Sequence, residues 1–105
     1  MRAETAYIMK LNAQQRFERL NLYGLVQSLS YVVRLNDLKT AQRLRVRLAL
    51  VLRQPKGLAK SLRAELTQLF AISGVWVRNV GDRHQTKRHI QELIRRILPR
   101  LKLRW

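Results

Sequence analysis

The chain has 105 residues, of which 47% are apolar, a length and composition that suit one domain with a modest core and exclude a disordered basic tail. Lys and Arg number 22 against six Asp and Glu, and the resulting formal charge of +16 indicates a polyanionic partner. The absence of cysteine excludes disulfides and Cys-based zinc sites, and no apolar run is long enough for a signal peptide or a transmembrane span.

The first predicted helix runs from about residue 3 to residue 35, because apolar residues recur there at roughly helical spacing. Asn21 and Gly24 weaken its middle, so the segment is either one bent helix or two shorter ones. Asn36-Asp37 is typical of a boundary where one helix ends and the next begins, since either residue can cap the helix that follows.

The second segment, residues 38–53, fits two periods. As a helix it presents an apolar stripe, made of Leu38, Ala41, either Leu44 or Arg45, Leu48 and Leu52. As a strand it alternates Arg43, Arg45 and Arg47 with Leu and Val. Its Leu, Ala, Gln and Arg are strong helix formers, so we predict a helix, and the strand stays open as an alternative.

A turn is predicted at residues 54–57, followed by an amphipathic helix over residues 58–72 that Gly74 can end. Residues 75–80 are β-like but short, and we expect a packed connection there. Asp82 is a predicted N-cap for the last helix, which Pro99 should kink or end. Together these elements predict an all-α fold, a small antiparallel bundle of three to four amphipathic helices forming a single basic domain over residues 1–105.

Two runs of basic residues are the candidate nucleic-acid-binding residues. No acid occurs between Asp37 and Glu65, and on a helix Lys39, Arg43 and Arg47 share one face. Most of the basic residues are Arg, whose planar fork matches phosphate oxygens in pairs. Helix-end electrostatics explain part of the second run, so we rank the first above it. The predicted contacts are Lys39, Arg43, Arg45, Arg47, Arg53, Lys56, Lys60 and Arg63 in the first run, and Arg83, Lys87, Arg88, Arg95, Arg96, Arg100, Lys102 and Arg104 in the second.

The sequence contains no constellation typical of catalysis. The six acids are scattered, and there is neither a glycine-rich phosphate loop nor a nucleophile elbow. His84 and His89 are five positions apart, which does not place them on one helical face, and no cysteine completes a metal site. We therefore expect no enzyme activity, no cofactor and no metal. Trp105 could stack on an unpaired base, but packing on its own bundle is the commoner role.

These observations favour a nucleic-acid-binding accessory protein, a small subunit of a larger ribonucleoprotein or nucleic-acid-processing complex, which holds the phosphate backbone with little base readout. In size and charge the chain is similar to small helical accessory subunits such as CRISPR small subunits and the bundle proteins that accompany some reverse transcriptases. This likeness is one of architecture and carries over no residue. Whether the nucleic acid is RNA or DNA is undecided.

Two alternatives remain. In a DNA-binding regulator of the ribbon–helix–helix type, Arg43, Arg45 and Arg47 would enter the major groove from a strand. A basic interaction protein would instead bind an acidic protein or an anionic membrane. A core of this size is also marginal, so we expect a protein partner or a homo-oligomer, in an intracellular, soluble setting, cytoplasmic or nucleoid-associated.

Overall fold

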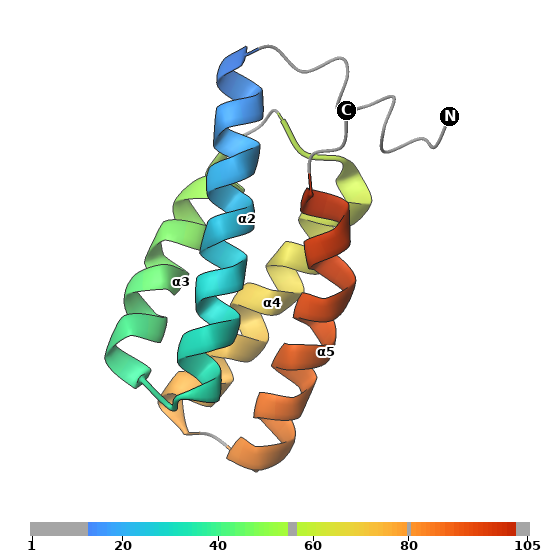
Figure 1. Cartoon of the computed structure of the whole chain (residues 1–105). Helices are drawn as coiled ribbons and strands as arrows, with labels where there is room; N and C mark the ends of the chain where they lie inside the picture. Colours follow the sequence, from blue (N-terminus) through green and yellow to red (C-terminus); the bar gives the residue numbers. More distant parts are fainter. Residues whose placement is uncertain (1–12, 55–56, 80, 103–105) are drawn as a thin grey trace.

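The computed structural model describes residues 13–54, 57–79 and 81–102, and for residues 13–20 only the backbone is considered. It contains four helices: α2 (Ala13–Arg34), α3 (Leu38–Arg53), α4 (Lys60–Arg78) and α5 (Arg83–Leu101). Successive helices run in opposite directions along the long axis (Figure 1). The predicted all-α antiparallel bundle is confirmed.

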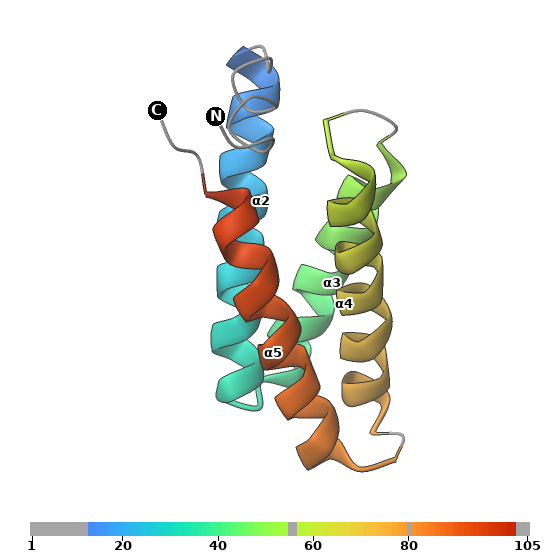
Figure 2. The same cartoon turned by 90° about the vertical axis from the view of Figure 1, so that its right-hand side faces the viewer.

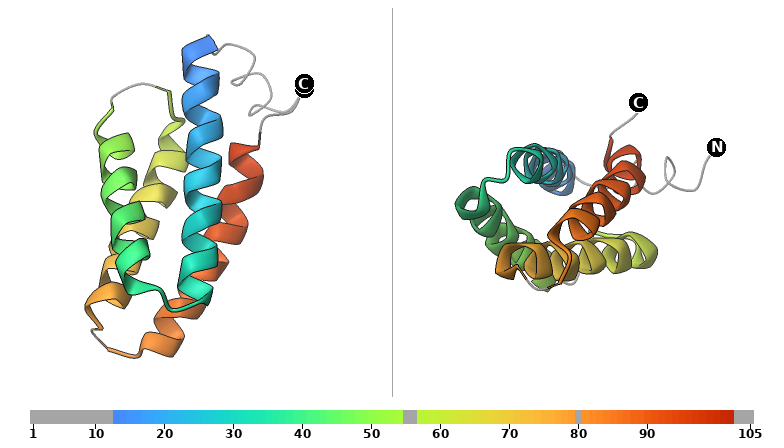
Figure 3. Two further views of the ribbon diagram at one scale, coloured as in Figure 1. Left: turned by 60° about the vertical axis from the view of Figure 1, so that its left-hand side comes forward. Right: turned by 90° about the horizontal axis from the view of Figure 1, so that it is seen from below.

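The helices form a four-cornered ring. Both α2 and α4 pack along α3 and α5. The views in Figures 2 and 3 accordingly place α3 and α5 at opposite corners, with α2 and α4 between them. The bundle measures 41 × 23 × 21 Å, so its long axis is about twice either width. This arrangement decides which basic residues can face the same partner.

Segment 38–53 is a helix, so the helical interpretation of its sequence pattern is correct and the alternating strand pattern is not. Helical spacing turns Leu44 and Leu48 inward, and both are buried against α2 and α4. The strand that a ribbon–helix–helix regulator needs is absent from the described part of the chain. All four helices contribute to one core, whose buried apolar residues are Leu22, Leu25, Val26, Leu29, Val32, Val33, Ala41, Leu44, Leu48, Leu62, Leu66, Leu69, Trp76, Ile90, Leu93, Ile94, Ile97 and Leu101.

Aspartates begin two of the helices, as the sequence predicted. The Asp37 carboxylate accepts a hydrogen bond from the Thr40 amide at 3.1 Å and another from the Thr40 hydroxyl at 2.7 Å. These two bonds hold the pKa of Asp37 below its ordinary value, because they stabilise the ionised form. Asp82 caps α5 by accepting from the Gln85 amide at 3.2 Å. Both caps satisfy amides that have no partner within their helix.

Two predicted helix boundaries are wrong. Gly74 does not end α4, which continues to Arg78 and buries Trp76 completely. Asn79 ends it instead, in the left-handed conformation with φ of 58°. The sequence predicted that Pro99 kinks or ends the last helix; Pro99 lies inside α5, which ends two residues later at Leu101, so the end lies two residues beyond the proline.

No helix within the described residues combines the length and the apolar character needed to cross a membrane.

Candidate nucleic-acid interface

Four cations line the outer surface of α3. Lys39, Arg43, Arg47 and Arg53 are all exposed, and we call this set the α3 face. The first three are spaced four residues apart, so they follow one another along the helix over about 12 Å. None of the four has a hydrogen bond or an ion pair within the described residues. Their charges are therefore available to a partner.

Arg45 differs from its neighbours because it points into the bundle. Its side chain is buried, with the Nε donating to the Ser73 hydroxyl at 3.0 Å and one terminal nitrogen donating to the Phe70 carbonyl at 3.0 Å. The other terminal nitrogen donates to the Gln42 side chain at 2.7 Å, and the Cζ lies 4.4 Å from the centre of the Phe70 ring. Burial lowers the pKa of Arg45, and the charge of Arg78 acts in the same direction. We therefore leave Arg45 out of the proposed interface.

The guanidinium of Arg45 also explains why a glycine stands inside α4. A Cβ on residue 74 would lie 2.9 Å from the Arg45 Cζ, closer than side-chain atoms approach one another. In an α-helix the Phe70 carbonyl lies one turn before residue 74, so the guanidinium reaches that carbonyl across the space a side chain would fill. Gly74 is thus required by packing, which outweighs its cost of about 1 kcal/mol in a helix interior.

Three further cations of the candidate set bind the carboxyl ends of helices. Arg63 donates to the carbonyls of Leu52 and Gln54 at the end of α3. Lys87 donates to the Arg34 carbonyl and to the Asn36 side chain at the end of α2, each at 3.1 Å. Arg83 donates to the Trp76 carbonyl at 3.2 Å near the end of α4. Each cation donates to a carbonyl at or near the carboxyl end of a helix, the negative end of the helix dipole.

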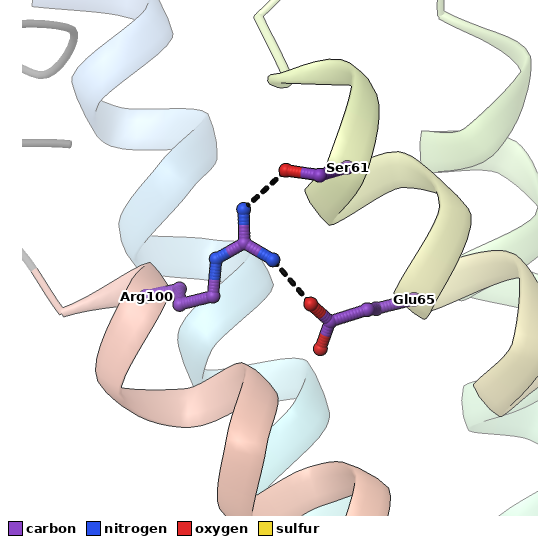
Figure 4. A network of polar contacts seen from close by, with 3 residues as sticks. All are labelled: Ser61, Glu65 and Arg100. Carbon is purple, nitrogen blue, oxygen red and sulfur yellow. Dashed lines mark hydrogen bonds and ion pairs between the residues drawn. The ribbon is translucent and has the colours of Figure 1, made fainter. Parts of the chain in front are cut away.

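Arg100 joins α5 to α4. Its guanidinium forms an ion pair with Glu65 and donates to the Ser61 hydroxyl at 2.6 Å (Figure 4). Both partners lie on α4, four residues apart and therefore on one side of that helix. Arg45, Arg63, Arg83, Lys87 and Arg100 thus all have partners within the bundle, which the basic runs in the sequence did not reveal.

A second exposed set lies on α5 and consists of Arg88, Arg95, Arg96 and Lys102, which we call the α5 face. Arg88, Arg95 and Lys102 follow one another at intervals of seven residues, two helical turns, so they occupy one side of the helix. Glu92 is the only acid between Arg83 and Lys102. Of the other predicted contacts, Lys60 is exposed at the start of α4, and Lys56 and Arg104 lie outside the described residues, as does Trp105.

Between the two faces the surface is largely uncharged. No side chain at positions 21–33 of α2 or 64–77 of α4 is both exposed and charged. Among the residues of these two helices whose side chains the structure describes, the exposed charges are Arg34, Lys60 and Arg78. Because α3 and α5 occupy opposite corners of the ring (Figure 3), the α3 face and the α5 face lie on opposite sides of the bundle.

Sequence reasoning missed an apolar pair within the α3 face. Val46 and Leu50 are 52% and 56% exposed, and lie three and seven positions after Arg43, on the same side of the helix. Leu50 also borders a groove of about 220 Å³ between α2 and α3, together with Leu22, Leu25 and Arg47. The signal was present in the sequence, since helical spacing places both apolar residues on the side opposite the buried stripe, among the arginines. The α5 face has no exposed large apolar residue.

The described residues contain no group of three or more His, Asp or Glu side chains that could hold a metal ion. A groove of about 540 Å³ between the end of α4 and the start of α5 is lined by polar residues that include Asp82, His89 and Glu92.

No protein-family model matches this sequence, and searches of curated proteins and of solved structures found no similar protein.

Proposed function

We propose that this protein binds nucleic acid as an accessory subunit of a larger ribonucleoprotein or nucleic-acid-processing complex, holding the phosphate backbone through the α3 and α5 faces. The observation that supports this proposal is the division among the cations. Five are used by the fold, whereas none of the eight exposed cations of the two faces forms an ion pair within the described residues. Ordinary surfaces intersperse charges of both signs, so such faces suit a partner that is itself a polyanion.

The two faces suit the backbone better than the bases. Arg and Lys contact phosphate oxygens without regard to sequence, whereas base readout needs side chains inserted into a groove or aromatic platforms for unpaired bases. Trp76 is fully buried, and Tyr31 is the only aromatic residue among the exposed large hydrophobic side chains of the described part of the chain. Tyr31 lies on α2, away from both faces.

The salt dependence of affinity tests this function. Each cation that neutralises a phosphate releases counterions, so the logarithm of the binding constant falls linearly with the logarithm of salt concentration. With three or four contacts on a face, we expect a slope of about −3 to −4 for duplex DNA. Fluorescence anisotropy of labelled duplex and single-stranded oligonucleotides, RNA and DNA, at several salt concentrations measures it. Equal affinity for anionic vesicles, or a slope near zero, would contradict the proposal.

Charge removal from both faces identifies the residues. Replacing Arg43, Arg47, Arg53, Arg88, Arg95 and Arg96 by Gln should lower affinity on the order of 100-fold or more and bring the slope toward zero, equally for unrelated sequences. The control replaces the three exposed cations at helix ends, Arg34, Lys60 and Arg78, and should lose only a few-fold. If the control loses as much affinity per charge, net charge and not the two faces determines binding.

A second candidate function is docking of an acidic protein on the α3 face, which Val46 and Leu50 favour. Exposed apolar residues among arginines are typical of protein interfaces. The two candidates differ at position 50. If the α3 face binds phosphate, Leu50→Lys adds a contact and raises nucleic-acid affinity several-fold, while Leu50→Gln changes it little. If Leu50→Lys leaves the affinity and the salt slope unchanged, the α3 face is not in contact with nucleic acid, and protein docking is the better assignment.

A further inference from the structure

We propose that one molecule bridges two separate nucleic-acid duplex segments, one on the α3 face and one on the α5 face. This inference rests on the proposed function and adds to it a second, opposite contact surface. Each face carries four exposed cations, and the helices that bear them occupy opposite corners of the ring (Figures 2 and 3). The outer surfaces of α2 and α4 that separate the faces are uncharged over most of their described length.

A single duplex does not reach both faces. The bundle is 23 and 21 Å across its short dimensions, whereas the persistence length of duplex DNA is about 50 nm. Bending even 20–30 base pairs by 40–90° costs on the order of 1–6 kcal/mol. Over residues 21–33 of α2 and 64–77 of α4, a duplex passing from α3 to α5 would meet no exposed charge, so this stretch would add no electrostatic stabilisation. A duplex seated on one face therefore leaves the other face free.

The two faces also act almost independently in solution. The Debye length is about 10 Å at 0.1 M salt, roughly half the width of the bundle. Two duplexes held on opposite sides are thus largely screened from each other, and the first does not repel the second strongly. Removing the charges of one face should for the same reason leave the affinity of the other nearly intact.

A capture experiment tests bridging directly. A biotinylated duplex is fixed to beads, and a fluorescent duplex without biotin is added with the protein at about 0.1 M salt, where screening is effective. The wild-type chain should retain the fluorescent duplex on the beads. Replacing Arg43, Arg47 and Arg53 by Gln, or Arg88, Arg95 and Arg96 by Gln, should lower this capture at least tenfold. Each one-face variant should still bind a single labelled duplex in an anisotropy titration.

Two controls exclude other routes to capture. Replacing Arg34, Lys60 and Arg78 by Gln also removes three charges, but none of them belongs to either face, so capture should be unchanged. If this control loses capture, the net charge of the protein condenses the duplexes and the two faces do not bridge them. A mixture of the two one-face variants should not restore capture. If the mixture restores it, or if either variant captures alone, the protein bridges by self-association and the proposal is wrong. Wild-type protein that binds a duplex without capturing a second overturns bridging alone, whereas absence of any binding overturns the proposed function.

Discussion

Replacing Trp76 by Ala is expected to lower the free energy of unfolding by about 3–5 kcal/mol, a large part of the 5–15 kcal/mol typical of a small domain. The indole is fully buried and is the largest of the fully buried side chains. Its removal leaves a cavity that the packed helices around it can only partly close. Guanidinium unfolding followed by circular dichroism at 222 nm measures the change without depending on tryptophan fluorescence.

The matched variant is Trp76→Phe, which we expect to be far less harmful. The indole Nε1 is buried and has no hydrogen-bond partner among the described residues. An unpaired buried N–H costs about 1–3 kcal/mol in desolvation, so removing it offsets part of the lost packing. We expect a net loss below about 2 kcal/mol. If Phe is as damaging as Ala, the indole N–H stabilises the fold through a partner, and our account of this position is wrong.

Two glycines within helices should respond to alanine with opposite signs. Gly74→Ala places a Cβ against the buried Arg45 guanidinium, so this side chain must leave its acceptors. Hydrogen bonds to a charged group are worth about 1.5–3 kcal/mol each, and their loss exceeds the gain of about 1 kcal/mol in helix propensity. We expect a net destabilisation of about 1–3 kcal/mol, measured by the same unfolding experiment.

Gly24 provides the control because a Cβ there meets no atom within 4 Å. Gly24→Ala should therefore stabilise the protein by about 0.5–1 kcal/mol. In an Arg45→Ala background, Gly74→Ala should become stabilising as well, since the space is then open. A stabilising effect of Gly74→Ala in the wild-type chain would show that the guanidinium is not held at this place.

The helices were predictable because burial imposes a periodicity that the sequence records directly. The stripe through Ala41 and Leu48 on α3 is predicted correctly without tertiary knowledge. The end of α4 was not predicted correctly. Gly74 lies inside this helix because it makes room for the side chain of Arg45, which is 29 positions earlier in the chain. A local rule that treats glycine as a helix stop has no access to such a contact.

The candidate site was predicted in composition but not in arrangement. Arg45 falls where the helical stripe of α3 meets α4, and the sequence alone allowed either Leu44 or Arg45 on that stripe. The acceptors of Lys87 lie more than 50 positions away, so no local pattern could assign it to a helix end. The sequence does indicate that the two faces are separate. Short connections make successive helices neighbours, so the second and fourth helices of a four-helix ring lie at opposite corners.

The exposed cations of α3 and α5 are balanced across the bundle, so that its described part has two like-charged poles, separated by stretches of α2 and α4 without exposed charge. A molecule with one dominant basic patch is turned by a polyanion into a single orientation, whereas the proposed binding through two faces would let this one be captured in either of two. Once captured, it presents its other pole outward. A duplex coated with such molecules would reverse the sign of its own surface, and it would attract a bare duplex but repel another coated one.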